Sequence, residues 1–122
     1  MSISPEMLKQ FTATAQGRAQ RREEARIVRY RRARQLAKEA ADLLREQFGA
    51  TRVRAFGSLV HRERFTPWSD IDLAVWGLEG ADYFAAVARL QDLDPDIGID
   101  LVAIPHCRAS LLKQILEEGE DL

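Results

Sequence analysis

The sequence contains little cysteine, little histidine and no long apolar run, and each shortage excludes a class of protein. Cys107 is the one cysteine among 122 residues, so an internal disulfide is excluded. His106 and Cys107 are neighbours without further ligands at zinc-binding spacing, and we interpret both as structural. No apolar run is long enough to cross a membrane, and residues 1–5 lack the basic-then-apolar layout of a secretory signal. We therefore expect a cytoplasmic protein with no membrane association.

Acidic residues are scarce in the first half of the chain and basic residues are scarce in the second half, although the formal net charge is only −1. Residues 1–64 contain 15 Lys or Arg against 7 Asp or Glu, whereas residues 65–122 contain 3 against 12. The basic residues are concentrated between Arg18 and Arg34, where a helix carries them on several faces. Such a helix contacts water alone, an acidic protein surface or nucleic acid. Nucleic acid is the least favoured of the three, because no binding motif or aromatic platform accompanies the arginines.

The N-terminal part of the chain predicts a long helix. Ser4 and Pro5 are typical of a cap and a first turn, Gly17 is a candidate interruption, and Gly49 is a typical stop. The second half carries apolar side chains at helical spacing, namely Ala33, Leu36, Ala37, Ala40, Leu43, Leu44 and Phe48. We therefore expect residues 1–48 to form a helical extension that packs on a core of residues 49–122.

The remaining residues alternate between strand-like and helix-like segments. Strands are predicted near residues 51–56, 69–76 and 97–104, and helices near residues 58–64, 80–93 and 107–118. This alternation indicates an α/β (α+β) fold, in which helices flank a small mixed sheet and the N-terminal helical extension lies beside it. The apolar side chains of segment 80–93 predict a helix core rather than a base-stacking platform: Tyr83, Phe84, Val87 and Leu90.

Two acids lie inside the apolar segment 69–76. Because side chains alternate along a strand, Asp70 and Asp72 project from one face, with Cα atoms roughly 6.5 Å apart. At that distance two carboxylates repel each other by about 2 to 3 kcal/mol at an effective dielectric constant of about 20. A third acid, Asp100, lies in another apolar run and can be brought beside them by a sheet. Three carboxylates without a His or Cys ligand favour a hard divalent cation, Mg²⁺ first, together with substrate phosphates.

Asp96 competes with Asp100 for the position of third acid, because it has the same strand parity. It belongs to Asp94-Pro95-Asp96, however, which is typical of a turn. Apolar neighbours place Asp100 inside a strand, and we therefore favour Asp100. Trp68 and Trp76 flank the first two acids and are expected either to line a nucleotide pocket or to pack at the strand ends.

Gly57 and Ser58 mark a predicted strand-to-helix turn, which is a suitable place for a phosphate group. Glycine permits close approach of the backbone, the first N–H groups of the turn are unpaired, and the Ser58 hydroxyl adds a donor. Arg62 and Arg64, with His61, follow on the same segment and could assist in binding a polyphosphate. Ser is also a common helix cap, so this pair gains its meaning from the acids that follow it.

The segment FGSLVHRERFTPWSDIDLAVWG, residues 56–77, resembles the signature of the minimal nucleotidyltransferases (MNT) of the polymerase-β superfamily. That signature combines Gly-Ser, an Asp-x-Asp pair and a later Asp, which correspond here to Gly57, Ser58, Asp70, Asp72 and Asp100. The resemblance implies transfer of a nucleoside monophosphate, AMP from ATP, to an acceptor hydroxyl. It also implies a site for two Mg²⁺ ions in which the three acids hold metal and Asp100 is the general-base candidate.

The resemblance also implies a partner, since minimal nucleotidyltransferases are often paired with HEPN-domain toxins. In such pairs the nucleotidyltransferase is the antitoxin and can adenylylate a tyrosine of the toxin. We therefore expect a HEPN-domain partner that carries the acceptor hydroxyl. Two alternatives stay open, a stand-alone enzyme that modifies a small hydroxylated molecule, as aminoglycoside-modifying relatives do, and an antitoxin that acts by binding alone.

Overall fold

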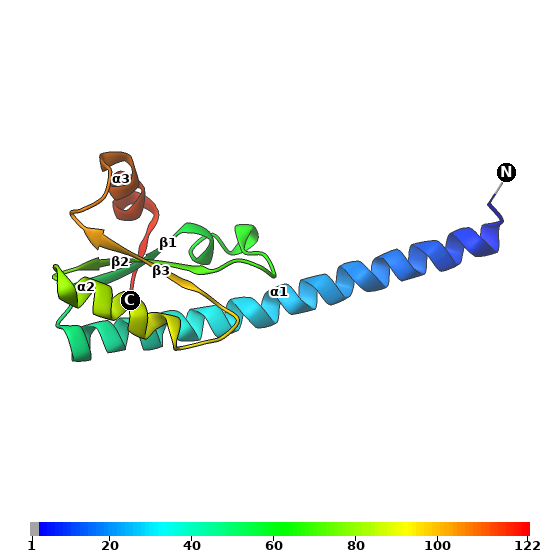
Figure 1. Ribbon diagram of the computed structural model, residues 1–122. Helices are drawn as coiled ribbons and strands as arrows, with labels where there is room; N and C mark the ends of the chain where they lie inside the picture. Colours follow the sequence, from blue (N-terminus) through cyan, green and yellow to red (C-terminus); the bar gives the residue numbers. More distant parts are fainter. Residues whose placement is uncertain (1–2) are drawn as a thin grey trace.

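The computed structural model describes residues 3–122, which form a sheet of four strands and three helices (Figure 1). The helices are α1 (Pro5–Phe48), α2 (Ala81–Gln91) and α3 (Ala109–Glu118). The strands are β1 (Arg52–Phe56), β2 (Ile71–Trp76), β3 (Ile99–Ile104) and β4 (Glu120–Asp121), and two 3-10 turns, η1 (Gly57–Leu59) and η2 (Arg62–Arg64), follow β1. The predicted α/β (α+β) class with a small mixed sheet is confirmed.

Helix α1 begins and ends where its capping residues predict. The Ser4 hydroxyl accepts a hydrogen bond from the Met7 N–H, and Pro5 occupies the first turn, where no N–H is needed. Gly49 ends the helix in the left-handed region at φ 74° and donates its N–H to the Arg45 carbonyl. Gly17, the candidate interruption, does not interrupt the helix, which continues through this residue. A single glycine costs a helix only about 1 kcal/mol relative to alanine.

The sheet has the order β3-β2-β1-β4. Strand β2 pairs in parallel with β3 and antiparallel with β1, and β1 pairs antiparallel with β4. The antiparallel pairing of β1 and β2 places the end of β1 beside the start of β2, and the parallel pairing of β2 and β3 places the start of β3 beside the start of β2. Three segments that are separated in the sequence therefore meet at the same end of the strands.

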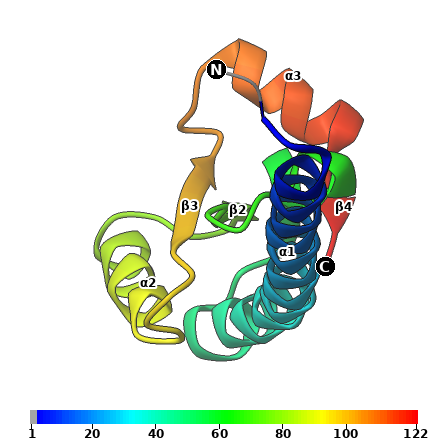
Figure 2. The same cartoon turned by 90° about the vertical axis from the view of Figure 1, so that its right-hand side faces the viewer.

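Helices cover both faces of the sheet. The second half of α1 and helix α2 lie on one face and α3 lies on the other, as Figures 1 and 2 both show. The larger core, between the sheet and the first pair of helices, includes all the predicted apolar positions of α1 except Phe48, which is half-buried. In α2, Leu90 is buried, but the prediction for Phe84 is wrong, because this side chain is 72% exposed.

The short strand β4 has no counterpart in the sequence-based prediction. Besides their pairing with β1, its residues contact arginines: the Arg34 guanidinium bonds both carboxylate oxygens of Glu120, and Arg52 and Arg54 lie 2.9 and 3.0 Å from the Asp121 carboxylate. A strand of two residues is too short to show alternation of apolar and polar side chains, so only the charge pattern could have indicated that this segment pairs with β1. The basic first half of the chain thus binds its own acidic second half.

The first part of α1 projects away from the rest of the molecule (Figure 1). Between residues 3 and 25 every residue except Ala15 and Gly17 is exposed, and the first α1 side chain that bonds the rest of the fold is Arg26, whose Nη1 donates to the Arg62 carbonyl. Exposed apolar side chains gather at its tip: Ile3, Met7, Leu8 and Phe11. Within residues 3–122, no helix is both long enough and apolar enough to span a membrane.

Deletion of residues 1–21 is expected to leave the melting temperature of the remaining chain unchanged within about 3 °C, because residues 3–21 add no side chain to the core. Deletion of residues 1–34 is the matched comparison. It also removes Arg26 and Arg34 with their contacts to the body, and it is expected to lower the melting temperature by well over that amount. Thermal unfolding followed by circular dichroism compares the two. Equal destabilisation by both deletions would show that the projecting part supports the fold.

Candidate active site

The register of the parallel strands brings two of the three predicted acids together. Asp72 and Asp100 are direct partners in the β2–β3 pairing, and their apolar neighbours point to the opposite face. Ile71 and Ile99, partners one position earlier, are both buried in the larger core. The apolar residues thus fix the face on which the carboxylates lie. The prediction that Asp100 belongs to a strand is confirmed.

The turn after β1 approaches the same carboxylates. Gly57 has φ 72°, and a Cβ atom at this position would lie 2.5 Å from Oδ2 of Asp72. Glycine is therefore required twice here, for the left-handed backbone and for the close approach. The N–H groups of Ser58 and Leu59 lie inside the 3-10 turn η1 and cannot be bonded by it, so they are available as donors. The predicted proximity of Gly57-Ser58 and the acids is thus present in the fold.

The electrostatics of the acids centre on Asp72. Burial raises the pKa of the Asp72 carboxyl, the negative charges of Asp100 and Asp70 raise it as well, and together they bring it to about 6. No cation offsets this repulsion at Asp72 in the hydrogen bonds and ion pairs of residues 3–122. A carboxylate whose ionised form is disfavoured in this way is a site where a bound cation gains free energy.

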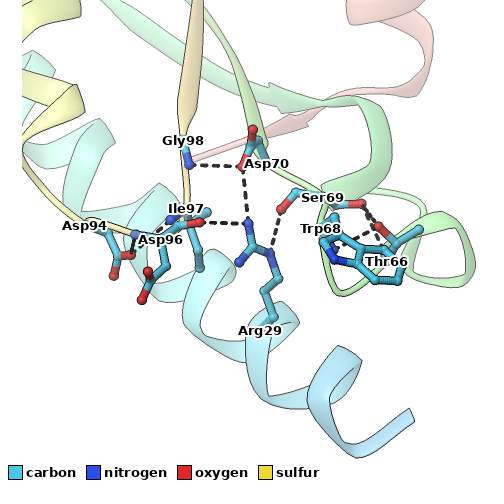
Figure 3. A network of polar contacts seen from close by, with 9 residues as sticks. All are labelled: Arg29, Thr66, Trp68, Ser69, Asp70, Asp94, Asp96, Ile97 and Gly98. Carbon is cyan, nitrogen blue, oxygen red and sulfur yellow. Dashed lines mark hydrogen bonds and ion pairs between the residues drawn. The ribbon is translucent and has the colours of Figure 1, made fainter. Parts of the chain in front are cut away.

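Asp70 lies one residue before β2 and is held from two sides (Figure 3). Its Oδ1 accepts a hydrogen bond from the Gly98 N–H at 3.0 Å and one from Arg29 Nη2 at 3.3 Å. Arg29 comes from helix α1 and also donates to the carbonyls of Ser69 and Asp96. One oxygen of Asp70 is therefore occupied by protein donors, whereas Figure 3 shows the other directed away from Arg29.

The three acids do not form a closed ligand cage. Within the part of the chain that the structure describes, no group of three or more His, Cys, Asp or Glu has the geometry to hold a metal by itself. Mg²⁺ does not need such a cage, because it is usually bound by one or two carboxylates together with substrate phosphates and water. Asp72 and Asp100, with the free oxygen of Asp70, fit this requirement by their chemistry.

The single helix predicted over residues 58–64 is wrong. The segment forms two separate 3-10 turns, and His61 between them has the non-helical angles φ −114° and ψ 79°. The Arg62 guanidinium lies over the ring of Tyr30, 5.4 Å from its centre, and so faces α1 rather than the acids. His61 faces α3, with Nε2 3.6 Å from the Glu118 carboxylate. Among residues 3–122, no hydrogen bond or ion pair joins the side chain of Arg62 or Arg64 to the acids, and their role in nucleotide binding stays a prediction.

The turn predicted at Asp94-Pro95-Asp96 is confirmed. Oδ1 of Asp94 accepts hydrogen bonds from the N–H groups of Asp96 and Ile97, which is the closing pattern of an Asx turn. Asp96 contributes its carbonyl to Arg29, and its side chain lies outside the sheet. Asp96 is therefore part of the support of the site rather than its third acid.

The two tryptophans differ in their surroundings. Trp68 is 76% exposed on a turn that is closed by hydrogen bonds between Thr66 and Ser69, directly before Asp70. Trp76 lies at the far end of β2, with the Arg52 guanidinium 4.8 Å from its ring centre. The packing alternative therefore describes Trp76, whereas Trp68 lies two residues before Asp70, and its place beside a nucleotide stays a prediction.

Arg29 is the site residue that sequence reasoning missed. It was one arginine among many in a basic helix whose expected partners were water, an acidic protein or nucleic acid. The available signal was the opposite charge of the two halves of the chain, which favours pairing within the molecule. Arg32 follows the same rule, since its Nε lies 3.2 Å from the Asp94 carboxylate.

Comparisons with known proteins agree with this geometry. Residues 38–122 match the family described as polymerase beta, nucleotidyltransferase. The same fold is found in a tri-AMPylated Shewanella oneidensis HEPN toxin in complex with MNT antitoxin, at 22% sequence identity and a TM-score of 0.55, where the match covers 73% of this chain and 70% of that chain. A toxin–antitoxin structure with AMP-PNP matches at 24% identity and a TM-score of 0.58, over 70% of each chain. The toxin–antitoxin pair MntA–HepT matches at 22% identity and a TM-score of 0.54, over 72% of this chain and 69% of that chain. A comparison with curated proteins gave no match.

Proposed function

Because this chain belongs to the polymerase beta nucleotidyltransferase family, we propose that it transfers AMP from ATP to a hydroxyl group of a HEPN-type partner protein. In this proposal the chain is the antitoxin of a toxin–antitoxin pair. Support for the partner comes from the similar structures, one of which contains a tri-AMPylated HEPN toxin with its MNT antitoxin. Support for the nucleotide comes from the similar structure with AMP-PNP.

The observation that carries the proposal is the pairing of Asp72 with Asp100 beside the Gly57 turn. A carboxylate pair on one side and unpaired backbone N–H groups on the other match the two ends of a metal–triphosphate complex. Asp70 and Asp100 are exposed, so a hydroxyl on the surface of another protein can reach them.

The proposed reaction assigns a task to each residue. The acceptor oxygen forms a bond to the α-phosphorus of ATP, the bond from that phosphorus to the bridging oxygen breaks, and pyrophosphate leaves. Asp100 accepts the proton of the attacking hydroxyl, and the Gly57-Ser58 turn orients the phosphates through its N–H groups and hydroxyl. Asp70, Asp72 and Asp100 would hold Mg²⁺, which would supply charge neutralisation for the triphosphate and would lower the pKa of the attacking hydroxyl.

Label transfer from α-³²P-ATP tests the proposal. The protein is mixed in equal amounts with the product of the adjacent reading frame, and with Mg²⁺, and the label on each protein is measured. We expect label on the partner with the wild type and none with Asp100→Asn, whereas Asp42→Asn, which changes an exposed acid of α1, is expected to label normally. Labelling of neither protein, without a complex between them, would contradict the proposal.

The same proteins, with complex formation, toxin neutralisation and pyrophosphate release as further measurements, separate the alternatives. An antitoxin that acts by binding alone is expected to form the complex and to neutralise the toxin equally well as wild type and as Asp100→Asn. A stand-alone enzyme is expected to release pyrophosphate only when a small hydroxylated acceptor, such as an aminoglycoside, is added.

A further inference from the structure

We propose that Arg29, which precedes the family-matched residues 38–122, is a positioning residue that clamps the starts of β2 and β3 and thereby presents Asp70 to the metal. The relevance of this clamp to metal binding rests on the proposed function. The clamp itself is a property of the fold and can be tested without metal or nucleotide.

The guanidinium of Arg29 joins two chain segments, the residues directly before β2 and the approach to β3. Its Nε donates to the Ser69 carbonyl at 2.9 Å, directly before β2, and its Nη2 donates to the Asp96 carbonyl at 3.0 Å, on the approach to β3. The same Nη2 reaches Oδ1 of Asp70 at 3.3 Å. Figure 3 shows the guanidinium between the two segments, with contacts to both.

The network continues through Gly98 and closes on itself. The Gly98 N–H donates to Oδ1 of Asp70, and the Gly98 carbonyl accepts from the Ile71 N–H at 2.9 Å. A Cβ atom on Gly98 would lie 3.2 Å from Oδ2 of Asp70, so the carboxylate rests directly against the glycine. The Asp70 carboxylate is therefore held in position by two donors, the Gly98 N–H directly before β3 and the Arg29 guanidinium.

This arrangement leaves a defined part of Asp70 for a ligand. Both donors use Oδ1, and no hydrogen bond in residues 3–122 uses Oδ2. A metal-binding carboxylate is commonly oriented by such donors to its second oxygen, and the loss of an orienting partner lowers metal affinity about 10- to 100-fold. Arg29 has this relation to Asp70.

The geometry requires arginine rather than a positive charge alone. Arginine offers a planar fork of donors that can reach acceptors on two segments at once, whereas the ammonium group of lysine is a compact point charge. The Arg29 side chain is 18% exposed, so water replaces its contacts only in part. Arg29→Lys therefore keeps the charge next to Asp70 and removes the clamp.

Amide hydrogen exchange of the metal-free protein tests the clamp. In Arg29→Lys we expect the Gly98 N–H to exchange about tenfold faster than in the wild type, because Asp70 loses one of its two anchors. Arg32→Lys is the matched control, since Arg32 lies one turn along α1 and bonds Asp94 rather than Asp70. We expect the Arg32 variant to change this rate by no more than about twofold. Equal Gly98 rates in the two variants would overturn the proposal.

Mn²⁺ binding in the presence of AMP-PNP, measured by electron paramagnetic resonance, tests the consequence for the metal. We expect the dissociation constant of Mn²⁺ to rise about tenfold in Arg29→Lys and to stay unchanged in Arg32→Lys. An unchanged or lower constant in Arg29→Lys would overturn the role of Arg29 in presenting Asp70. If the wild type binds no Mn²⁺, the proposed function is contradicted, and the exchange rates alone then decide whether Arg29 anchors Asp70.

Discussion

Replacement of Asp72 by asparagine is expected to lower the rate of nucleotidyl transfer by about a thousandfold, because metal-assisted charge stabilisation contributes several kcal/mol to such a reaction. Asp72, whose pKa is raised to about 6, lies between β3 and the Gly57 turn. Asparagine has nearly the same shape, so the loss measures the carboxylate and not the packing. The assay is label transfer at saturating ATP, with Asp42→Asn as the control. Transfer by Asp72→Asn above about a tenth of the wild-type rate would contradict this assignment.

The same substitution is expected to stabilise the metal-free protein at neutral pH. Folding raises the Asp72 pKa from 3.8 to about 6, so between these values the folded protein binds more protons than the unfolded chain. Wild-type stability therefore falls as the pH rises from about 4 to about 6 and stays at the lower level above that window. Asp72→Asn removes this loss, and we expect it to gain about 1 kcal/mol at about pH 7.5, a figure reduced for the partial exposure of the side chain.

Urea unfolding at two pH values measures this effect. The difference between Asp72→Asn and wild type is expected to be present at about pH 7.5 and to disappear below about pH 4, where the carboxyl is protonated in both states. Asp42→Asn is expected to show no such pH-dependent gain. A variant less stable than the wild type at neutral pH would show that the Asp72 carboxylate has a stabilising partner.

The second large effect is expected at Gly57. Substitution by alanine is expected to lower the free energy of unfolding by about 3 kcal/mol and to abolish transfer. This loss of unfolding free energy is the sum of a backbone cost and a steric cost. The left-handed backbone costs about 1 kcal/mol for a residue with a Cβ atom, and the new methyl group would have to displace the Asp72 carboxylate, 2.5 Å away.

Gly49 provides a matched control for the backbone cost alone. It has φ 74°, close to the 72° of Gly57, but a Cβ atom there would have no neighbour within 4 Å. Gly49→Ala is therefore expected to cost only about 1 kcal/mol and to leave transfer unchanged. Chemical denaturation of both variants gives the difference, which we assign to the clash with Asp72. Equal costs at the two glycines would mean that the turn can move away from the carboxylate.

Much of the fold follows from local sequence patterns. The alternation in segments 69–76 and 97–104 predicted strands whose bounds, β2 and β3, lie within two residues of the predicted ones. The capping residues at both ends of α1 were sufficient to place that helix, because their side-chain and backbone requirements are local.

The failures have physical reasons as well. The segment 58–64 carries no helical periodicity that could distinguish one helix from two 3-10 turns, and the turns are fixed by contacts with α1, such as that between Arg62 and Tyr30. Strand β4 is recruited by arginines from distant segments, which a local pattern cannot reveal. Phe84 satisfies the helical spacing of α2 but lies at the border of its buried face, where spacing does not decide exposure.

The site was predictable in its composition but not in its supports. Asp72, Asp100 and Gly57 are brought together by strand pairing, which the apolar neighbours of each residue indicate. The contacts of Arg29 depend on where the long helix passes under the sheet, and no periodicity in the sequence contains that information.

The in-register pairing of β2 and β3 also limits how this chain can change in length. A slip of β3 by one residue would turn Asp100 toward helix α2 and bring Ile99 and Leu101, now packed in the larger core, out on the side of Asp72. The burial of these two side chains opposes such a slip. An insertion before β3 is therefore expected to bulge out as a longer connection, and the apolar residues that hold the sheet together also keep the two acids opposite each other.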